Sequence, residues 1–132
     1  MTDSLADRKA VLATNQAFYD AFSQRDIGSM SSLWWQGSTS LCVHPGGRII
    51  IGWESIRTSW ESIFNNTNSL EIDFEVIKLE TDRSLAYIAV REIVLQSSRG
   101  RKFKAESSAT NIFQKMAQKW YLVNHHGSPI MR

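Results

Sequence analysis

The sequence is poor in residues that cross-link or interrupt a chain. Its 132 residues include one cysteine, two prolines and seven glycines. A single cysteine cannot form an internal disulfide, which excludes a disulfide-stapled scaffold and fits a reducing compartment. The low proline and glycine content excludes collagen-like and disordered material. The apolar content of 42% is enough to bury a core. We therefore predict one globular domain that spans residues 1–132.

Neither charge nor hydrophobicity is concentrated in the sequence. The net charge is +2, and the basic residues are scattered, with their densest run at 99–104. A nucleic-acid partner is therefore not expected. No apolar run approaches the ~18 residues that a membrane span needs, and the polar first nine residues lack the apolar segment of a signal peptide. We expect a cytoplasmic protein with no membrane partner.

The first half of the sequence has the period of helices. Apolar residues recur at helical spacing and predict a helix over residues 4–25. Asp26 is a suitable cap for a second, shorter helix. A third helix is predicted after Gly52, where another apolar stripe begins. Between the last two helices, residues 40–51 predict two short extended segments around a Pro-Gly-Gly turn.

The second half changes to the period of strands. Apolar and acidic residues alternate over 70–76, which indicates a strand with one wet face. Residues 85–95 are apolar on both faces and predict a central strand. Two further strands are predicted over 103–114 and 120–126, with hairpin-length breaks between them. Helices followed by an antiparallel meander predict an α+β fold whose curved sheet encloses a cone-shaped pocket.

Several motifs appear in this order of elements. They lie at residues 17–22 with Asp26 and Met30, and at 33–34, 42–46, 52–64 and 120–129. With these motifs the sequence resembles the SnoaL-like branch of the nuclear transport factor 2-like superfamily, which includes ketosteroid isomerase and polyketide cyclases. The resemblance implies a cone-shaped α+β fold, with N-terminal helices packed in a curved, mostly antiparallel sheet. It also implies a hydrophobic cavity, a homodimer formed through the outer sheet face, and no cofactor.

The resemblance also bears on catalysis. His44-Pro45 resembles the Asp-Pro at which ketosteroid isomerases place their general base. Phe18 falls where that enzyme has its tyrosine donor, and it has no hydroxyl. Thr110 or Asn111 falls at the position of the protonated acid donor. Neither is acidic, although either could donate a hydrogen bond. Steroid isomerisation by that mechanism is therefore not expected.

The three histidines are the main candidates for chemistry. His44 lies beside the Pro-Gly-Gly turn, where it would act either as a base at a pocket rim or as a structural residue that holds the loop. His125 and His126 are neighbours on a predicted strand, so they point to opposite faces. Both faces mix apolar and polar residues, and the pattern does not decide which histidine faces inward. No ligand spacing supports a metal site.

Cys42 and the tryptophans are predicted to line the pocket or the core. Cys42 and His44 share one strand face, but positions two apart are separated by ~6.5–7 Å, which predicts no direct contact. Indole rings such as Trp34 and Trp60 would favour a flat, apolar ligand.

The candidate residues divide into two groups. The catalytic candidates are His44, Asn111 and His126. The ligand-binding candidates are Phe18, Trp34, Cys42, Trp60, Thr110 and His125. They predict a protein that binds a small hydrophobic molecule, with isomerase, cyclase or dehydratase chemistry that uses no cofactor. In such a reaction His44 would remove a proton alpha to a carbonyl, and Thr110 or Asn111 would polarise the oxyanion. The alternative is a non-catalytic dimeric scaffold or protein-interaction module.

Overall fold

Three helices precede the long strands, as predicted. The computed structural model describes residues 4–131. The helices are α1 (Leu5–Gln24), α2 (Ile27–Leu33) and α3 (Trp53–Asn65). Ser4 caps α1 by accepting a hydrogen bond from the backbone N–H of Asp7, and Asp26 caps α2 by accepting one from Ser29. None of these described helices is long and apolar enough to cross a bilayer.

The strands within residues 4–131 form one six-stranded mixed sheet. They are β1 (Leu41–Val43), β2 (Ile50–Ile51), β3 (Ser69–Asp82), β4 (Leu85–Ser98), β5 (Arg101–Met116) and β6 (Lys119–Pro129). Their order is β2-β1-β6-β5-β4-β3, and only the β1–β6 pair among them is parallel. β4 lies between β3 and β5, as predicted for a strand inside the sheet. Only one of its faces is buried, because Leu85 and Tyr87 on the other are 54% and 39% exposed.

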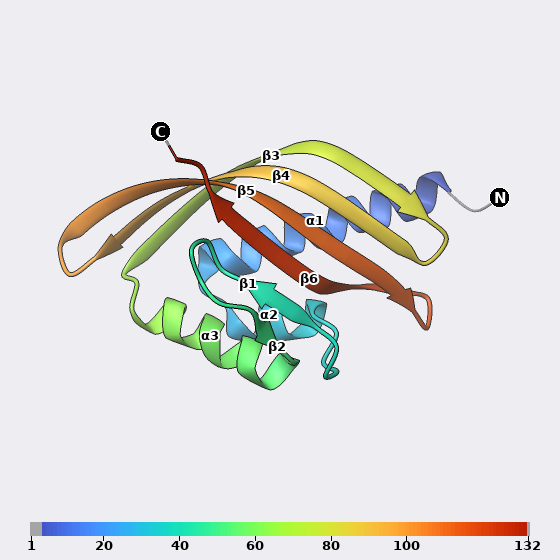
Figure 1. Cartoon of the computed structure of the whole chain (residues 1–132), viewed down its shortest axis with the longest axis horizontal. Helices are drawn as coiled ribbons and strands as arrows, with labels where there is room; N and C mark the ends of the chain where they lie inside the picture. The colour runs from blue at the N-terminus through green and yellow to red at the C-terminus, as the bar shows by residue number, and fades with distance from the viewer. Residues whose placement is uncertain (1–3, 132) are drawn as a thin grey trace.

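The sheet arches over α1, and α2 and α3 lie on the same side near β1 and β6 (Figure 1). Register shifts interrupt the ladders between Val76 and Lys78 and between Ile112 and Phe113. Bulges of this kind increase the local twist and bend of a strand. We call the side that faces the helices the inner face and the opposite side the outer face. The expected cone-shaped α+β fold is confirmed.

The core lies between α1, α3 and the inner face. Its largest fully buried apolar side chains are Phe18, Tyr19, Met30, Trp34, Ile56, Trp60, Ile88, Phe113 and Leu122. Trp60 of α3 meets Phe18 of α1 edge-on, with ring centroids 5.7 Å apart. Aromatic pairs in this geometry add to the stability that their buried area provides. The aromatic contacts therefore hold the two helices together across the interior.

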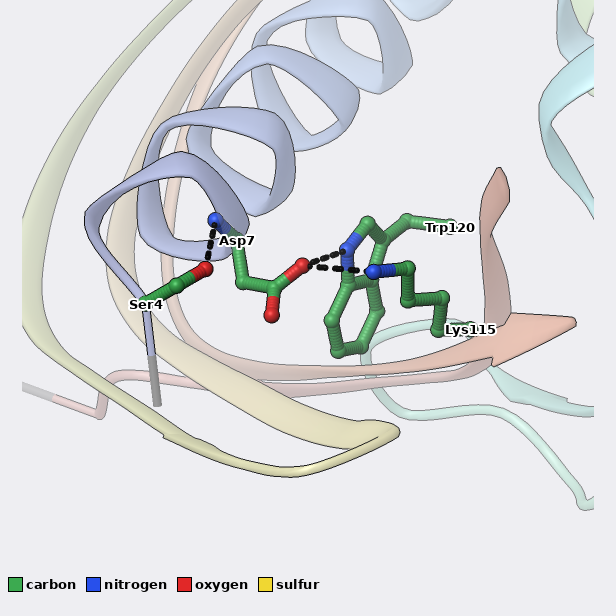
Figure 2. A network of polar contacts seen from close by, with 4 residues as sticks. All are labelled: Ser4, Asp7, Lys115 and Trp120. Atoms are coloured by element: carbon green, nitrogen blue, oxygen red, sulfur yellow. Dashed lines mark hydrogen bonds and ion pairs between the residues drawn. The ribbon is translucent and has the colours of Figure 1, made fainter. Parts of the chain in front are cut away.

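A polar cluster ties the start of α1 to the β5–β6 hairpin (Figure 2). Asp7 Oδ1 accepts hydrogen bonds from Lys115 Nζ at 3.0 Å and from Trp120 Nε1 at 3.3 Å. The hydrogen bond from Lys115 is the largest cause that lowers the pKa of Asp7. Lys115 and Trp120 flank the turn of the hairpin. The cluster therefore fixes the N-terminal end of α1 against the β5–β6 hairpin.

Candidate functional site

His44 is held between three elements at the edge of the interior. It follows the last residue of β1 and is partly buried. Its imidazole Nε2 lies 2.9 Å from Ser59 Oγ of α3. The next residue, Pro45, packs so closely on Gly127 of β6 that a Cβ there would lie 2.9 Å from Pro45 Cγ. A glycine at 127 therefore lets the His44 loop approach the sheet.

The hydrogen bonds of Ser59 determine the tautomer of His44. The Ser59 hydroxyl lies 2.6 Å from the backbone carbonyl of Ile56, which can only accept. Its proton is used there, so the Ser59 oxygen accepts from His44 Nε2–H. Neutral His44 thus keeps a lone pair on Nδ1. Burial lowers the pKa of His44, which favours this neutral, basic form near pH 7.

The predicted separation of Cys42 and His44 is wrong. Cys42 Sγ lies 3.8 Å from His44 Nε2 and 4.0 Å from Nδ1. β1 ends at Val43, so His44 no longer follows strand geometry and its ring can turn back toward the thiol. Burial, together with the negative charge of Glu92, raises the pKa of Cys42 to about 12. The thiol is therefore protonated at neutral pH and is not an activated nucleophile.

His125 and Asn111 form the buried part of the site. They are directly opposite one another on β6 and β5, and both point to the inner face. His125 Nδ1 lies 2.6 Å from Asn111 Oδ1. The Asn111 amide nitrogen lies 2.9 Å from Asn15 Oδ1 and 3.2 Å from Tyr19 Oη. Both amide hydrogens are therefore engaged inside the protein.

Three buried polar residues in this network were missed by the sequence analysis. They are Asn15 and Tyr19 of α1 and Glu92 of β4, each no more than 1% exposed. The Tyr19 hydroxyl lies 2.5 Å from Glu92 Oε2. A signal for Glu92 was present, since it continues the alternation of Ile88 and Val90 on the inner face. The interior thus does contain a tyrosine hydroxyl, one residue after Phe18.

Burial dominates the electrostatics of this network. Together with the positive charges that His44 and His126 can carry, it lowers the pKa of His125 to about 3. It raises the pKa of Glu92, against the hydrogen bond from Tyr19, which lowers it. Burial and the Glu92 charge also raise the pKa of Tyr19. At neutral pH, His125 and Tyr19 are therefore uncharged.

Aromatic rings surround the two imidazoles. The ring centroids of Trp60 and His44 are 4.7 Å apart, and those of Phe18 and His125 are 4.9 Å apart. Trp34 packs against Phe18 and Trp53 farther along the core. Within the described residues, the buried indole N–H groups of Trp34 and Trp60 have no hydrogen-bond partner. Buried N–H groups without partners are uncommon in native structures.

The structure brings together seven of the nine predicted site residues and separates two. The seven are Phe18, Trp34, Cys42, His44, Trp60, Asn111 and His125. Thr110 and His126 are exposed and lie opposite one another on the outer face. They line a shallow hollow of about 650 Å³ together with Ile77, Ala89 and Ile112. Their predicted roles in the interior would require them on the other side of the sheet.

The interior groups that remain free define what this arrangement can do chemically. The Trp60 N–H can donate a hydrogen bond, and His44 Nδ1 carries a lone pair that can accept a proton, with only the weak donor Cys42 Sγ beside it at 4.0 Å. Asn111 has no free N–H left to stabilise an oxyanion. No group of three or more metal-binding side chains occurs within residues 4–131. The free groups suit binding of a polar atom on an otherwise apolar molecule.

The fold is that of the nuclear transport factor 2-like class. Residues 11–132 match the family model described as a SnoaL-like domain. The chain therefore belongs to the SnoaL-like family, which confirms the resemblance seen in its motifs.

Solved structures show the same fold. A provisionally assigned dehydratase of the nuclear transport factor 2-like family from Streptomyces avermitilis is 26% identical, with a TM-score of 0.89 over 96% of this chain and 98% of that chain. A ketosteroid isomerase-like protein from Erwinia carotovora is 16% identical, with a TM-score of 0.86 over 98% of this chain and 100% of that chain.

One curated relative comes from a plant. F-box protein SKIP8 of Arabidopsis thaliana is 21% identical over 126 residues, which cover 96% of this chain and 52% of that protein. The chain therefore spans about half the length of this relative.

Proposed function

We propose that this protein binds a small, mainly apolar molecule in the interior between α1, α3 and the inner sheet face, with His44 at the entrance. The observation that carries the proposal is the unpaired N–H of Trp60, buried among aromatic rings beside two imidazoles. Leaving such a donor unsatisfied costs about 1–3 kcal/mol. A bound molecule with an acceptor atom would remove this cost.

The buried polar network supports the same proposal. Five polar side chains, among them the carboxyl of Glu92, are nearly inaccessible in the interior. Burying such groups lowers stability unless every one is well paired. A protein that needed only a folded scaffold could fill these positions with apolar side chains. Membership of the SnoaL-like family and the likeness to the provisionally assigned dehydratase support a binding role for this region.

Acid/base chemistry would use His44 as the base. Its lone pair on Nδ1 and its lowered pKa suit proton removal near pH 7. The predicted oxyanion role of Asn111 lacks support, because both of its amide hydrogens are engaged. The Trp60 N–H would take that role instead. The proposal therefore places binding first and requires no cofactor.

Native mass spectrometry of the protein, purified gently from its own source, tests the binding role. We expect each subunit to carry an excess mass that corresponds to one small molecule. His44→Ala should fold with an unchanged far-UV spectrum and lose at least about tenfold in affinity for that molecule, which corresponds to about 1.4 kcal/mol. His126→Ala is the matched control for a neighbouring face. A fall in thermal stability of His44→Ala with unchanged affinity would contradict the proposal.

A second role, homodimer assembly, is favoured by the outer face. Ile77 and Leu85 are 61% and 54% exposed in the single chain, and hollows of about 620 and 650 Å³ lie beside them. Contiguous exposed apolar surface commonly marks an interface. F-box protein SKIP8 matches this chain over about half of its own length, so a region similar to this chain also occurs within a longer protein. A bare dimer, or one that carries another protein, would favour this role over ligand binding.

We also propose that the protein is cytoplasmic. Its free cysteine, Cys42, is buried and protonated, which is compatible with a reducing compartment. Fractionation of its own source followed by immunodetection tests this proposal.

A further inference from the structure

A continuous chain of hydrogen bonds runs from Glu92 to His125 through the interior. Glu92 Oε2 lies 2.5 Å from Tyr19 Oη, which lies 3.2 Å from Asn111 Nδ2. On the other side of the amide, Asn111 Oδ1 lies 2.6 Å from His125 Nδ1. Four elements, β4, α1, β5 and β6, contribute one residue each. These hydrogen bonds thus connect the Glu92 carboxyl group to the His125 imidazole, with which it makes no direct hydrogen bond.

The hydrogen bonds in this chain have a direction. A separation of 2.5 Å is typical of a hydroxyl that donates to an ionised carboxylate. Tyr19 then spends its single proton on Glu92, and its oxygen accepts from the Asn111 amide. The Asn111 oxygen consequently accepts from His125 Nδ1–H. Neutral His125 has one ring proton, so its Nε2 carries a lone pair.

Protonation of Glu92 would reverse every link. The new carboxyl O–H would donate to Tyr19, whose hydroxyl would turn to donate to Asn111. The Asn111 amide, which has nearly the same shape in both orientations, would turn over and donate to His125 Nδ1. The ring proton would leave Nδ1 for solvent, and a solvent proton would bind Nε2. The imidazole stays neutral, and the net change is one proton gained by Glu92.

Asn15 provides an independent indication that the reversed arrangement is accessible. Its Oδ1 accepts from Asn111, but its own amide nitrogen has no partner within the described residues. If both amides turn over, Asn15 Nδ2 donates to the Asn111 oxygen. The unpaired atom is then a carbonyl oxygen, which proteins tolerate better than an unpaired N–H. The reversed network is therefore at least as well satisfied at this end.

We propose that Glu92 determines specificity through Tyr19 and Asn111, by setting whether His125 Nε2 accepts or donates a hydrogen bond. With Glu92 ionised, the interior offers an acceptor and selects molecules that carry a hydroxyl or N–H group. With Glu92 protonated, it offers a donor and selects a carbonyl oxygen. The ligand preference rests on the binding function proposed above, whereas the coupling between Glu92 and His125 does not.

The described groups that surround Glu92 carry no positive charge that would hold its carboxyl group ionised. The groups from neighbouring elements are Tyr19 of α1, Phe74 of β3, Ser107 of β5, Cys42 of β1 and, beyond Asn111, His125 of β6. None of these is a cation while His125 is neutral. Burial therefore raises the pKa of Glu92. The hydrogen bond from Tyr19 opposes this rise, and no neighbouring positive charge adds to its effect.

Nuclear magnetic resonance of the whole chain tests the coupling directly. Histidine ¹⁵N signals distinguish a ring nitrogen that bears a proton from one with a lone pair, and the Glu92 carboxyl carbon reports its own titration. We expect the two His125 nitrogens to exchange character at the same midpoint as the Glu92 carbon. His125 nitrogens that stay unchanged while Glu92 titrates would overturn the proposal, and this measurement needs no variant. His126→Gln identifies the His126 signals, so that those of His125 are assigned without ambiguity.

Tyr19→Phe removes the hydroxyl that connects Glu92 to Asn111 and keeps the aromatic ring. In this variant the Glu92 carbon should still titrate, while His125 should keep one tautomer across the same range. A Tyr19→Phe protein in which His125 follows Glu92 as in the wild type would contradict a role for the hydroxyl. Glu92→Gln should likewise abolish the pH dependence of the His125 tautomer.

Phenol and acetophenone test the preference for ligand chemistry, because one carries a hydroxyl donor and the other a carbonyl acceptor. Above the Glu92 midpoint phenol should bind about tenfold more tightly than acetophenone, the effect of one hydrogen bond worth about 1.4 kcal/mol. Below it the preference should reverse. An equal preference at both pH values would overturn the specificity role. If neither probe binds while the coupling is present, the proposed binding function fails and the coupling stands.

Discussion

The two faces of β5 and β6 place neighbouring residues in opposite environments. Asn111 and His125 on the inner face are at most 1% exposed and hydrogen-bonded to one another. Thr110 and His126, one residue away, are exposed on the outer face. The residue types on the two faces are similar in polarity. The comparison shows that the chemistry of a polar side chain here depends on strand register more than on residue type.

Among substitutions that test the difference between the two faces, Asn111→Ala should have the largest effect. It would leave groups on His125, Asn15 and Tyr19 without partners, each at a cost of about 1–3 kcal/mol. We expect a loss of about 4 kcal/mol in the free energy of unfolding, measured by urea denaturation. Thr110→Ala on the other face should change it by no more than about 0.5 kcal/mol. Equal losses in the two variants would contradict the contrast.

A pH series sharpens the comparison between the two adjacent histidines. The pKa of His125 is held at about 3 in the folded protein, against an ordinary value of 6.5. Because the folded state resists protonation, its stability is fully present above 6.5 and is lost as the pH falls toward 3. Between about pH 6.5 and 4.5 the loss from this residue should be about 2 kcal/mol.

Variants isolate the contribution of His125 from that of Glu92. The pKa of Glu92 is raised, so its protonation stabilises the fold as the pH falls and partly offsets the loss. His125→Gln should flatten the dependence of the unfolding free energy on pH, whereas His126→Gln should leave it close to the wild type. A His126→Gln protein with the flatter curve would reverse the assignment of the two faces.

Substitutions on the outer face should change the association of two copies rather than the stability of the fold. Ala89 lines the hollow that we propose as a dimer contact. Ala89→Arg would bury a charge between two copies and should raise the dimer dissociation constant at least about tenfold. Analytical ultracentrifugation measures this change, with Ser55→Arg on the exposed surface of α3 as the control. An unchanged constant would exclude this part of the face from the interface.

The smallest effect is expected at the rim, where Asp7 contacts the β5–β6 hairpin. Asp7→Asn should lower Tm by roughly a few degrees, whereas Asp20→Asn, which is exposed on the same helix, should not. The pKa of Asp7 is lowered, so its contribution is present above 3.8 and is lost as the pH falls through its folded value. Thermal melts at pH 7 and at acidic pH check both points.

Local periodicity was sufficient to predict the helices and the long strands. The cap at Asp26 and the alternation in β3 are local signals, and the structure agrees with both. The inward position of His125 was not predictable in this way. It follows from pairing with Asn111 across fourteen residues, while both faces of β6 mix apolar and polar side chains.

The rest of the candidate site depends on contacts distant in sequence. Tyr19 and Glu92 are separated by 73 positions, and no local pattern indicates that their side chains form a hydrogen bond in the fold. The contact between Cys42 and His44 depends on where β1 ends, which is set by its pairing with β6. Asn15 could have been recognised, since it lies on the apolar stripe of α1 between Val11 and Phe18.

The place of β6 in the sheet has a consequence for the order of folding. It is the last strand in the sequence, yet it lies between β5 and β1, and its parallel pairing joins residues 41–43 to 124–126. Such non-local pairing carries a large loop-closure entropy and forms slowly. During synthesis β1 therefore has to wait for β6, and two strand edges stay open to aggregation until it arrives. His125, which lies on β6, thus reaches its buried position only when the pairing of β6 with β1 completes the sheet.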